Sequence, residues 1–229
     1  MKFAVMQPYL FPYLGYYQLV NSVDKFIFYD DVTFIKGGFI NRNNILSNGR
    51  AQRFTLPVPG LSSNVLINQL SFDKNVKKAL KTIEQNYRKA PYFQDVYPII
   101  ERVLNSEDRS VEQICAKSVI VVFEYLDISK SFCFSSRLEY NRELSAAEKL
   151  VSMARIFKSS NYINSIGGKA LYNKDYFSSQ DIKLQFIKTK DYKYYQKSDE
   201  FVPNLSMIDV LMYNSKSDVI KLLNKYELI

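Results

Sequence analysis

Two prolines, Pro8 and Pro12, set the boundaries of the first elements that this chain can form. Each proline lacks an N–H group and keeps the residue before it out of the helical region, so neither a central strand nor a helix runs easily through them. An apolar run at residues 3–5 predicts a strand before the prolines, and residues 16–23 predict a helix after them. A second apolar run at residues 26–29 predicts the next strand. The chain therefore opens as strand, aromatic loop, helix and strand.

The alternation of strands and helices returns near the end of the chain, after a helical middle. Strands that alternate with helices predict an α/β fold, with a mostly parallel sheet flanked by helices as in nucleotide-binding proteins. We expect residues 1–229 to form a single domain with a helical insertion or lid around residues 75–126. In the first half of the chain we expect a hairpin up to residue 58, a short strand or turn at 66–70, and helices at 75–88, 92–104 (kinked or split at Pro98) and 111–126. In the second half we expect a strand at 132–134, a helix starting at the Ser145–Glu148 capping box, strands at 161–164 and 184–187, and a last helix at 207–213.

The chain of 229 residues contains no histidine, which removes many familiar catalytic groups. Ser-His-Asp triads, Cys-His pairs and imidazole metal ligands are all excluded. The two cysteines, Cys115 and Cys133, cannot form a Cys-rich zinc site, and we expect them to be buried thiols. Chemistry must then come from carboxylates, lysine, tyrosine, amides, backbone dipoles or the substrate itself.

The charge balance favours an anionic partner. The net charge is +8 and the pI about 9.2, which suits phosphates, nucleotides or nucleic acid. The positive charge is scattered and no nucleic-acid-binding motif occurs, so we expect no nucleic-acid partner. No apolar run approaches the roughly 20 residues of a transmembrane helix, and the N-terminal run is shorter than the ~7–15 residues of a secretory signal. We therefore expect no transmembrane segment and a cytoplasmic location.

Ligands of parallel α/β sheets bind beyond the carboxyl ends of strands, and three stretches of this chain are expected there. The first follows the first strand and begins with Gln7. The rings of Tyr9, Tyr13 and Tyr16 could stack on a base or a sugar, although core packing would also explain aromatic residues here. We assign these four residues to substrate binding.

The second stretch follows the second strand and begins with Asp30 and Asp31. These carboxylates could act as a base, orient a ribose or hold Mg²⁺ through oxygen ligands, while an ordinary turn at the strand end is the alternative. We assign Asp30, Asp31 and Lys36 to catalysis. We assign no metal site and no definite cofactor; Mg²⁺ is the cofactor that these carboxylates would suit.

Further along, an arginine stands among asparagines, and its guanidinium with the neighbouring amides could clamp a phosphate or carboxylate. Asparagine is also common in turns, which is the alternative. The third stretch, a Gly-Gly-Lys sequence, allows close backbone approach and suits an anion, but it lacks the spacing of a P-loop and a plain turn would explain it as well. The residues of these two stretches that we assign to substrate binding are Asn41, Arg42, Asn43, Gly167, Gly168 and Lys169.

Both halves of the chain resemble one protein family. The opening MQPYLFPYLGYYQLVNSVDKFIFYDDVTFIKGGFINRNNIL resembles the N-terminal signature of the WbqC-like family. The later YINSIGGKALY and FVPNLSMIDVLMYNSKSDVIKLLNKYELI resemble its C-terminal signature. This chain has Phe39 where the family often has an aromatic residue, but Gly37 where a basic residue is common. The second difference puts one anion contact in doubt.

The resemblance implies a bacterial protein encoded among genes for O-antigen, capsule or other surface glycans. One implied activity is transfer of an acyl or aminoacyl group onto a nucleotide-linked amino sugar, with a nucleotide-activated sugar and an acyl donor or carrier protein as partners. A looser similarity links the chain to nucleotidyltransferases, in which a Pro-x-x-Gly turn also follows the first strand. Those enzymes have histidine at or near the position of Tyr16, so the similarity favours nucleotide binding over adenylyl transfer.

Three functions therefore remain open at this point. The first is a transferase of surface-polysaccharide synthesis, in which Arg42 and Lys169 hold phosphates and an aspartate acts as base or ribose partner. The second is a protein that binds a nucleotide, a sugar or a partner enzyme without catalysis, because the sequence shows no recognisable nucleophile. The third, nucleic-acid binding, rests on the net charge alone.

Overall fold

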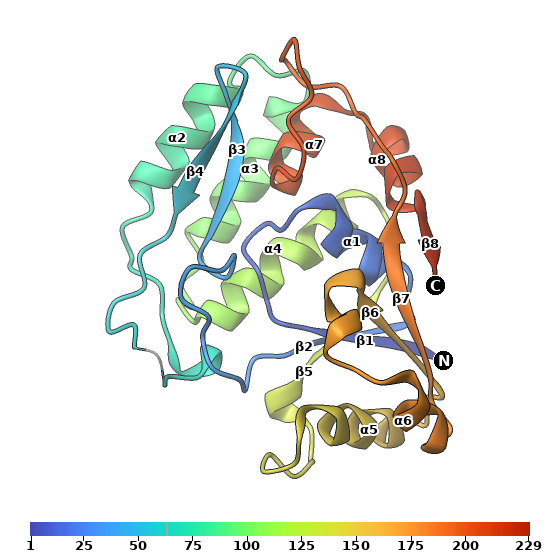
Figure 1. The fold of residues 1–229 in the computed structure, drawn as a ribbon. Coiled ribbons are helices and arrows are strands. Elements are labelled where there is room, and N and C mark those ends of the chain that lie inside the picture. Colours follow the sequence, from blue (N-terminus) through green and yellow to red (C-terminus); the bar gives the residue numbers. More distant parts are fainter. Residues whose placement is uncertain (63) are drawn as a thin grey trace.

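The computed structural model describes residues 1–62 and 64–229 and has the α/β fold that the sequence predicts. In this part of the chain six strands form one sheet in the order β5-β2-β1-β6-β7-β8 (Figure 1). The first five strands in this order are parallel, and only β8 runs antiparallel to its neighbour. The strands are β1 (Lys2–Met6), β2 (Lys25–Phe28), β5 (Ser131–Phe134), β6 (Asn161–Ser165), β7 (Lys183–Thr189) and β8 (Tyr226–Leu228).

The pairing of the central strands is uneven along their length. β1 pairs with β2 over four residues, from Phe3–Lys25 to Met6–Phe28. On its other side β1 pairs with β6 only at Lys2–Asn161 and Phe3–Tyr162 within the described chain, whereas β6 and β7 pair over five residues. β1 and β6 therefore separate before their carboxyl ends. This separation lies in the middle of the sheet.

Helices cover both faces of the sheet because successive strand residues point to opposite faces. Ala4 of β1 and Phe28 of β2 belong to the hydrophobic cluster that includes α1 (Leu14–Asn21), α4 (Val111–Tyr125) and α8 (Lys216–Leu223). Phe3, Val5 and Ile27 point the other way and pack with α5 (Ala146–Ile156) and α6 (Lys174–Ser179). The result is a helix–sheet–helix arrangement.

A long segment connects β2 to its parallel neighbour β5. It contains the hairpin of β3 (Arg42–Ser47) and β4 (Arg50–Thr55), the 3₁₀ turn η1 (Ile67–Gln69), α2 (Lys77–Tyr87), α3 (Phe93–Leu104) and then α4. The three helices predicted for the middle of the chain are confirmed. α4 lies against the sheet, α3 packs on α4 and on α7 (Met207–Tyr213), and α2 packs on the hairpin (Figure 1).

Two local sequence signals, a capping box and a proline within a helix, can be compared with the structure. The Ser145 capping box is confirmed, because Ser145 Oγ accepts from the Glu148 N–H at 3.4 Å and Glu148 Oε2 accepts from the Ser145 N–H at 2.9 Å. Pro98 does not split α3, since the buried face of Val96, Ile100 and Val103 holds the helix together across the missing hydrogen bond.

Turns and additional elements complete the described structure. Residues 66–70 contain the η1 turn, one of the two alternatives expected there, and the Gly-Gly-Lys sequence lies in another 3₁₀ turn, η3 (Ile166–Ala170). α6, α8, β8 and the 3₁₀ turn η2 (Ser135–Arg137) are additional elements. No helix in the described ranges has the length and apolar character needed to cross a bilayer.

Candidate functional site

The parting of β1 and β6 coincides with the point where the strand order reverses. From β1 the sheet continues through β2 to β5 on one side, and through β6 and β7 on the other. Such a topological switch point is where open α/β sheets bind ligands, beyond the carboxyl ends of the strands. Gln7 directly follows β1, and η3 directly follows β6. The fold thus brings the first and third predicted stretches to the same sheet edge.

The loop between β1 and α1 is held in an unusual conformation. Phe11 is buried and has a φ of +40°, a region that bulky residues rarely adopt. Its N–H donates to Ser118 Oγ at 2.8 Å, and its carbonyl oxygen accepts from Asn43 Nδ2 at 2.8 Å and from Ser206 Oγ at 2.6 Å. Strained backbone of this kind persists only where surrounding contacts enforce it, and it clusters at functional sites.

Gln7 presents an unsatisfied polar atom at the switch point. Its side-chain oxygen Oε1 is buried and has no hydrogen-bond partner among the described residues. The Tyr16 hydroxyl donates to the Gln7 carbonyl oxygen at 2.9 Å and so fixes its backbone. A buried acceptor without a donor is unfavourable, and a ligand that donates a hydrogen bond would remove that penalty.

The three predicted stacking tyrosines differ in exposure. Tyr16 is 3% exposed and packs between Tyr9 and Phe26, with ring centroids 5.6 and 5.5 Å away. Burial, followed by the neighbouring Tyr9, raises the pKa of the Tyr16 hydroxyl. Tyr9 is half-buried and Tyr13 is 37% exposed. The rings of Tyr9 and Tyr13 can contact a ligand, whereas the ring of Tyr16 is buried and packs beneath the loop as part of the core.

Asp30 and Asp31 lie together beyond β2, but their oxygens already accept hydrogen bonds from the chain. Asp30 is 1% exposed and accepts from Ser135 Oγ at 3.0 Å and from the N–H and hydroxyl of Ser136 at 2.9 and 2.6 Å. Asp31 accepts from the Tyr140 hydroxyl at 2.7 Å and from Arg142 Nε at 2.9 Å, and it shares the single hydroxyl proton of Ser135 with Asp30. In this geometry the two carboxylates fasten the segment that follows β5.

In the predicted Arg-Asn clamp, the asparagine side chains form hydrogen bonds within the chain, whereas the arginine is partly accessible to solvent. Asn43 is buried and holds Phe11, as described above, and Asn41 Nδ2 donates to the Leu56 carbonyl at 2.9 Å. Arg42 Nε donates to the Gly38 carbonyl at 2.9 Å, and the side chain is half-buried. Lys36 is exposed in the same loop. Arg42 and Lys36 are therefore the members of this group that can meet an anion.

The third stretch requires glycine for a steric reason. A Cβ atom on Gly168 would lie 2.4 Å from Asn164 Nδ2, so the turn can approach Asn164 only without a side chain. Asn164 is buried, and its Oδ1 accepts from the Ser165 N–H at 2.8 Å. Gly167 and Lys169 are exposed. The turn thus presents backbone and an ammonium group to solvent at the end of β6.

Two further residues at this edge were not predicted. Asn68 Oδ1 and Glu112 Oε2 are buried and have no hydrogen-bond partner in the described chain. Burial, followed by the charges of Asp30 and Asp108, raises the pKa of Glu112 to about 7, against the opposing effects of a hydrogen bond from its own backbone N–H and of Arg137. The sequence offered no signal, because a glutamate in the first turn of a helix is commonly exposed.

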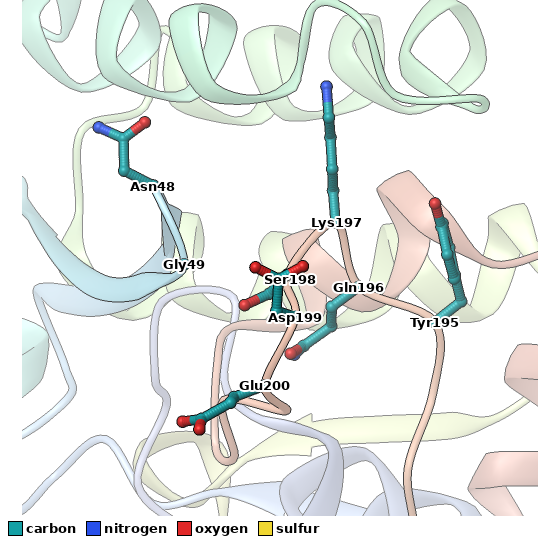
Figure 2. Close-up of a pocket in the computed structure, with 8 residues that line it drawn as sticks. All are labelled: Asn48, Gly49, Tyr195, Gln196, Lys197, Ser198, Asp199 and Glu200. Atoms are coloured by element: carbon teal, nitrogen blue, oxygen red, sulfur yellow. The ribbon is translucent and has the colours of Figure 1, made fainter.

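A large cavity of the described chain lies away from the switch point. It has a volume of about 650 Å³ and lies between the tip of the β3–β4 hairpin and residues 195–200 (Figure 2). Figure 2 shows the side chain of Lys197 pointing away from that of Glu200. None of the predicted site residues lines it. In residues 1–62 and 64–229, no cluster of three or more carboxylates or thiols has metal-binding geometry. We therefore keep the switch point as the candidate site.

These features define an α/β protein with a candidate ligand site at the switch point of a parallel sheet. The WbqC-like protein family model matches residues 7–221, and the chain belongs to this family. It is also 24% identical over 215 residues to Uncharacterized protein Rv1507c of Mycobacterium tuberculosis, a match that covers 92% of each protein. No solved structure matches the chain.

Proposed function

We propose that this protein binds a nucleotide-activated amino sugar at the switch point and transfers an acyl or aminoacyl group onto its amine during synthesis of a bacterial surface polysaccharide. One observation carries the binding part of this proposal: β1 and β6 separate at the switch point, where the buried Oε1 of Gln7 has no donor within residues 1–62 and 64–229. Hydroxyl and amide N–H groups of a nucleotide sugar are suitable donors. Membership of the WbqC-like family supports the polysaccharide context.

The charges and rings around the switch point suit the other parts of such a ligand. Arg42, Lys36 and Lys169 supply cations for a diphosphate, in keeping with the net charge of +8. Tyr9 and Tyr13 supply partly exposed rings for a base or a sugar. An amine nucleophile needs only deprotonation and an oriented acyl donor, so a site without histidine is chemically sufficient.

A thermal-shift screen against nucleotides and nucleotide sugars, with and without Mg²⁺, tests the binding step. A ligand at about 100 times its dissociation constant stabilises the folded state by ~2.7 kcal/mol, which is readily detected. Binding should be strongest for nucleotide-linked amino sugars and weaker in Gln7→Ala. If no nucleotide or nucleotide sugar stabilises the folded protein, the proposal is wrong.

A second candidate is a non-catalytic protein of the same pathway that binds a nucleotide sugar or a partner. The observation that favours it is that Asp30 and Asp31 each accept at least two hydrogen bonds from other donors of the chain, which is typical of structural carboxylates. A transfer assay with acyl and aminoacyl donors separates the two candidates. Binding without turnover for every donor would favour the second.

A further inference from the structure

We propose that Glu112 and Asn68 form the subsite that holds the amine of the amino sugar, and that Glu112 is the base that takes its proton. This inference rests on the proposed function and assigns its acceptor chemistry to residues outside the predicted site. It starts from a set of four buried side-chain atoms that lack hydrogen-bond partners in the described chain. Three of the four are acceptor oxygens, on Gln7, Asn68 and Glu112.

The backbone brings Asn68 and Glu112 to the same place. The Asn68 N–H donates to the Asp30 carbonyl at 3.0 Å, just beyond β2. The turn η1, which contains Asn68, packs against α4, and the Val111 N–H donates to the Leu70 carbonyl at 3.0 Å. Glu112 is in the first turn of α4, close enough to Asp30 to sense its charge. The two unpartnered oxygens therefore come from neighbouring elements at the carboxyl end of β2.

This place adjoins the switch point. The Tyr29 N–H donates to the Met6 carbonyl at 2.8 Å, so the residues that follow β1 and β2 run side by side. Neighbouring strands are about 4.8 Å apart, which is small compared with the length of a nucleotide sugar. One such ligand can contact Gln7 at the end of β1 and reach the end of β2.

The chemistry of the pair selects for a cationic donor. Two acceptors without donors call for N–H or O–H groups, and an ammonium group offers three N–H donors. The surrounding charges of Asp30 and Asp108 exceed the single charge of Arg137, so the environment favours a cation. Glu112 is half-buried as a whole residue, while its Oε2 atom is itself buried. Its pKa of about 7 also suits a group that must accept a proton near neutral pH.

The transfer step follows from this arrangement. The sugar ammonium gives one proton to Glu112 and becomes an amine with a free electron pair. That pair attacks the carbonyl carbon of an acyl or aminoacyl ester or thioester, so that a C–N bond forms and the bond from carbon to the leaving oxygen or sulfur breaks. The leaving group takes the proton that the nitrogen then loses, and Glu112 returns its own proton to solvent. The products are an amide, an alcohol or thiol, and one proton.

Calorimetric titration of two nucleotide sugars that differ only in an amine or a hydroxyl tests the subsite. In the unaltered protein the amino sugar should bind about tenfold more tightly than the hydroxyl sugar, because it makes a charge-assisted hydrogen bond. Glu112→Gln should remove this preference by weakening the binding of the amino sugar about tenfold. Titration of the amino sugar in two buffers with different ionisation enthalpies should show a proton exchange that Glu112→Gln abolishes.

Two control variants keep the test decisive. Glu107→Gln makes the same chemical change at an exposed residue of the preceding loop and should preserve the preference. Asn68→Ala should weaken binding of the amino sugar without altering the proton exchange, and it provides an independent test should Glu112→Gln fold poorly. An unchanged preference in both Glu112→Gln and Asn68→Ala would overturn the subsite and leave the proposed function standing. Absence of binding of both sugars to the unaltered protein would overturn the two proposals together.

Discussion

Asn43 of β3 donates a hydrogen bond of 2.8 Å from Nδ2 to the carbonyl oxygen of Phe11 in the loop after β1. The same Nδ2 group also donates to the Leu10 carbonyl at 3.2 Å, and Asn43 is only 2% exposed. One buried amide thus fixes two successive carbonyl groups of the strained loop. The hairpin in the long β2–β5 connection thereby determines the shape of the loop at the switch point.

Replacing Asn43 with alanine should therefore destabilise the fold by about 1–3 kcal/mol, because two buried carbonyl groups lose donors. Asn43→Asp should behave similarly, since an ionised carboxylate cannot donate. Urea unfolding measures the change. Asn105→Ala, at an exposed position, is the control and should stay within about 0.5 kcal/mol of the unaltered protein. If Asn43→Ala lowers the free energy of unfolding as little as the control does, Asn43 does not hold the loop.

Gly168 and Gly167 offer a matched pair in the turn after β6. A Cβ on Gly168 would meet the buried Asn164 side chain at 2.4 Å, whereas a Cβ on Gly167 would have its nearest neighbour, Ser165 Oγ, at 3.9 Å. We expect Gly168→Ala to cost about 1–3 kcal/mol through overpacking, and Gly167→Ala to have little effect. Thermal unfolding measures both, and a thermal-shift assay should show weaker stabilisation by a nucleotide sugar for Gly168→Ala. Equal behaviour of the two variants would contradict the steric argument.

Local sequence patterns predicted the fold because they act over a few residues. The apolar runs and helical spacing correctly placed most strands and helices, and the capping box correctly placed the start of α5. The short strand β8 was missed because its pairing with β7, from Ile187–Leu228 to Thr189–Tyr226, joins segments far apart in sequence. Periodicity cannot show such a partner.

The candidate site was only partly predictable for the same reason. Sequence could place Gln7, Asp30 and Gly167 beyond strand ends, but it could not show which polar atoms the chain itself would use. Asn43 and Asp30 form hydrogen bonds within the chain, whereas Gln7 Oε1 and Glu112 Oε2 are buried and have no partner among the residues that the structure describes. That distinction depends on tertiary contacts. It is nevertheless the property that separates a structural polar group from a candidate ligand contact.

The Asp31–Arg142 pair should prove structural. Arg142 is 44% exposed, so the ion pair itself is worth less than about 1 kcal/mol. However, its Nη2 group also donates to the carbonyls of Ser136 and Leu138 at 3.1 and 3.2 Å. We expect Arg142→Ala to destabilise the fold by about 1–2 kcal/mol in urea unfolding. The control is Lys188→Ala, which breaks the exposed 3.4 Å pair with Glu227 and should change stability by less than about 0.5 kcal/mol.

Glu112 should make the fold less stable as the pH rises. Its pKa is raised from an ordinary value of 4.5 to about 7, so between these values the folded state binds more protons than the unfolded state. Stability then falls with increasing pH across this range and levels off above about pH 7. The groups that face Glu112 are Asp30, Asp108, Arg137 and Cys115.

The size of this pH effect can be bounded and measured. A shift of this size corresponds to at most about 3–4 kcal/mol, which solvent screening reduces to on the order of 1 kcal/mol for a half-buried group. Glu112→Gln should therefore be more stable than the unaltered protein at pH 8 by about that amount, and the difference should disappear near pH 4.5. Urea unfolding at both values measures it, with Glu107→Gln as the control. A gain that is the same at both pH values would show that Glu112 does not titrate in this range, because only a change in its charge makes the difference depend on pH.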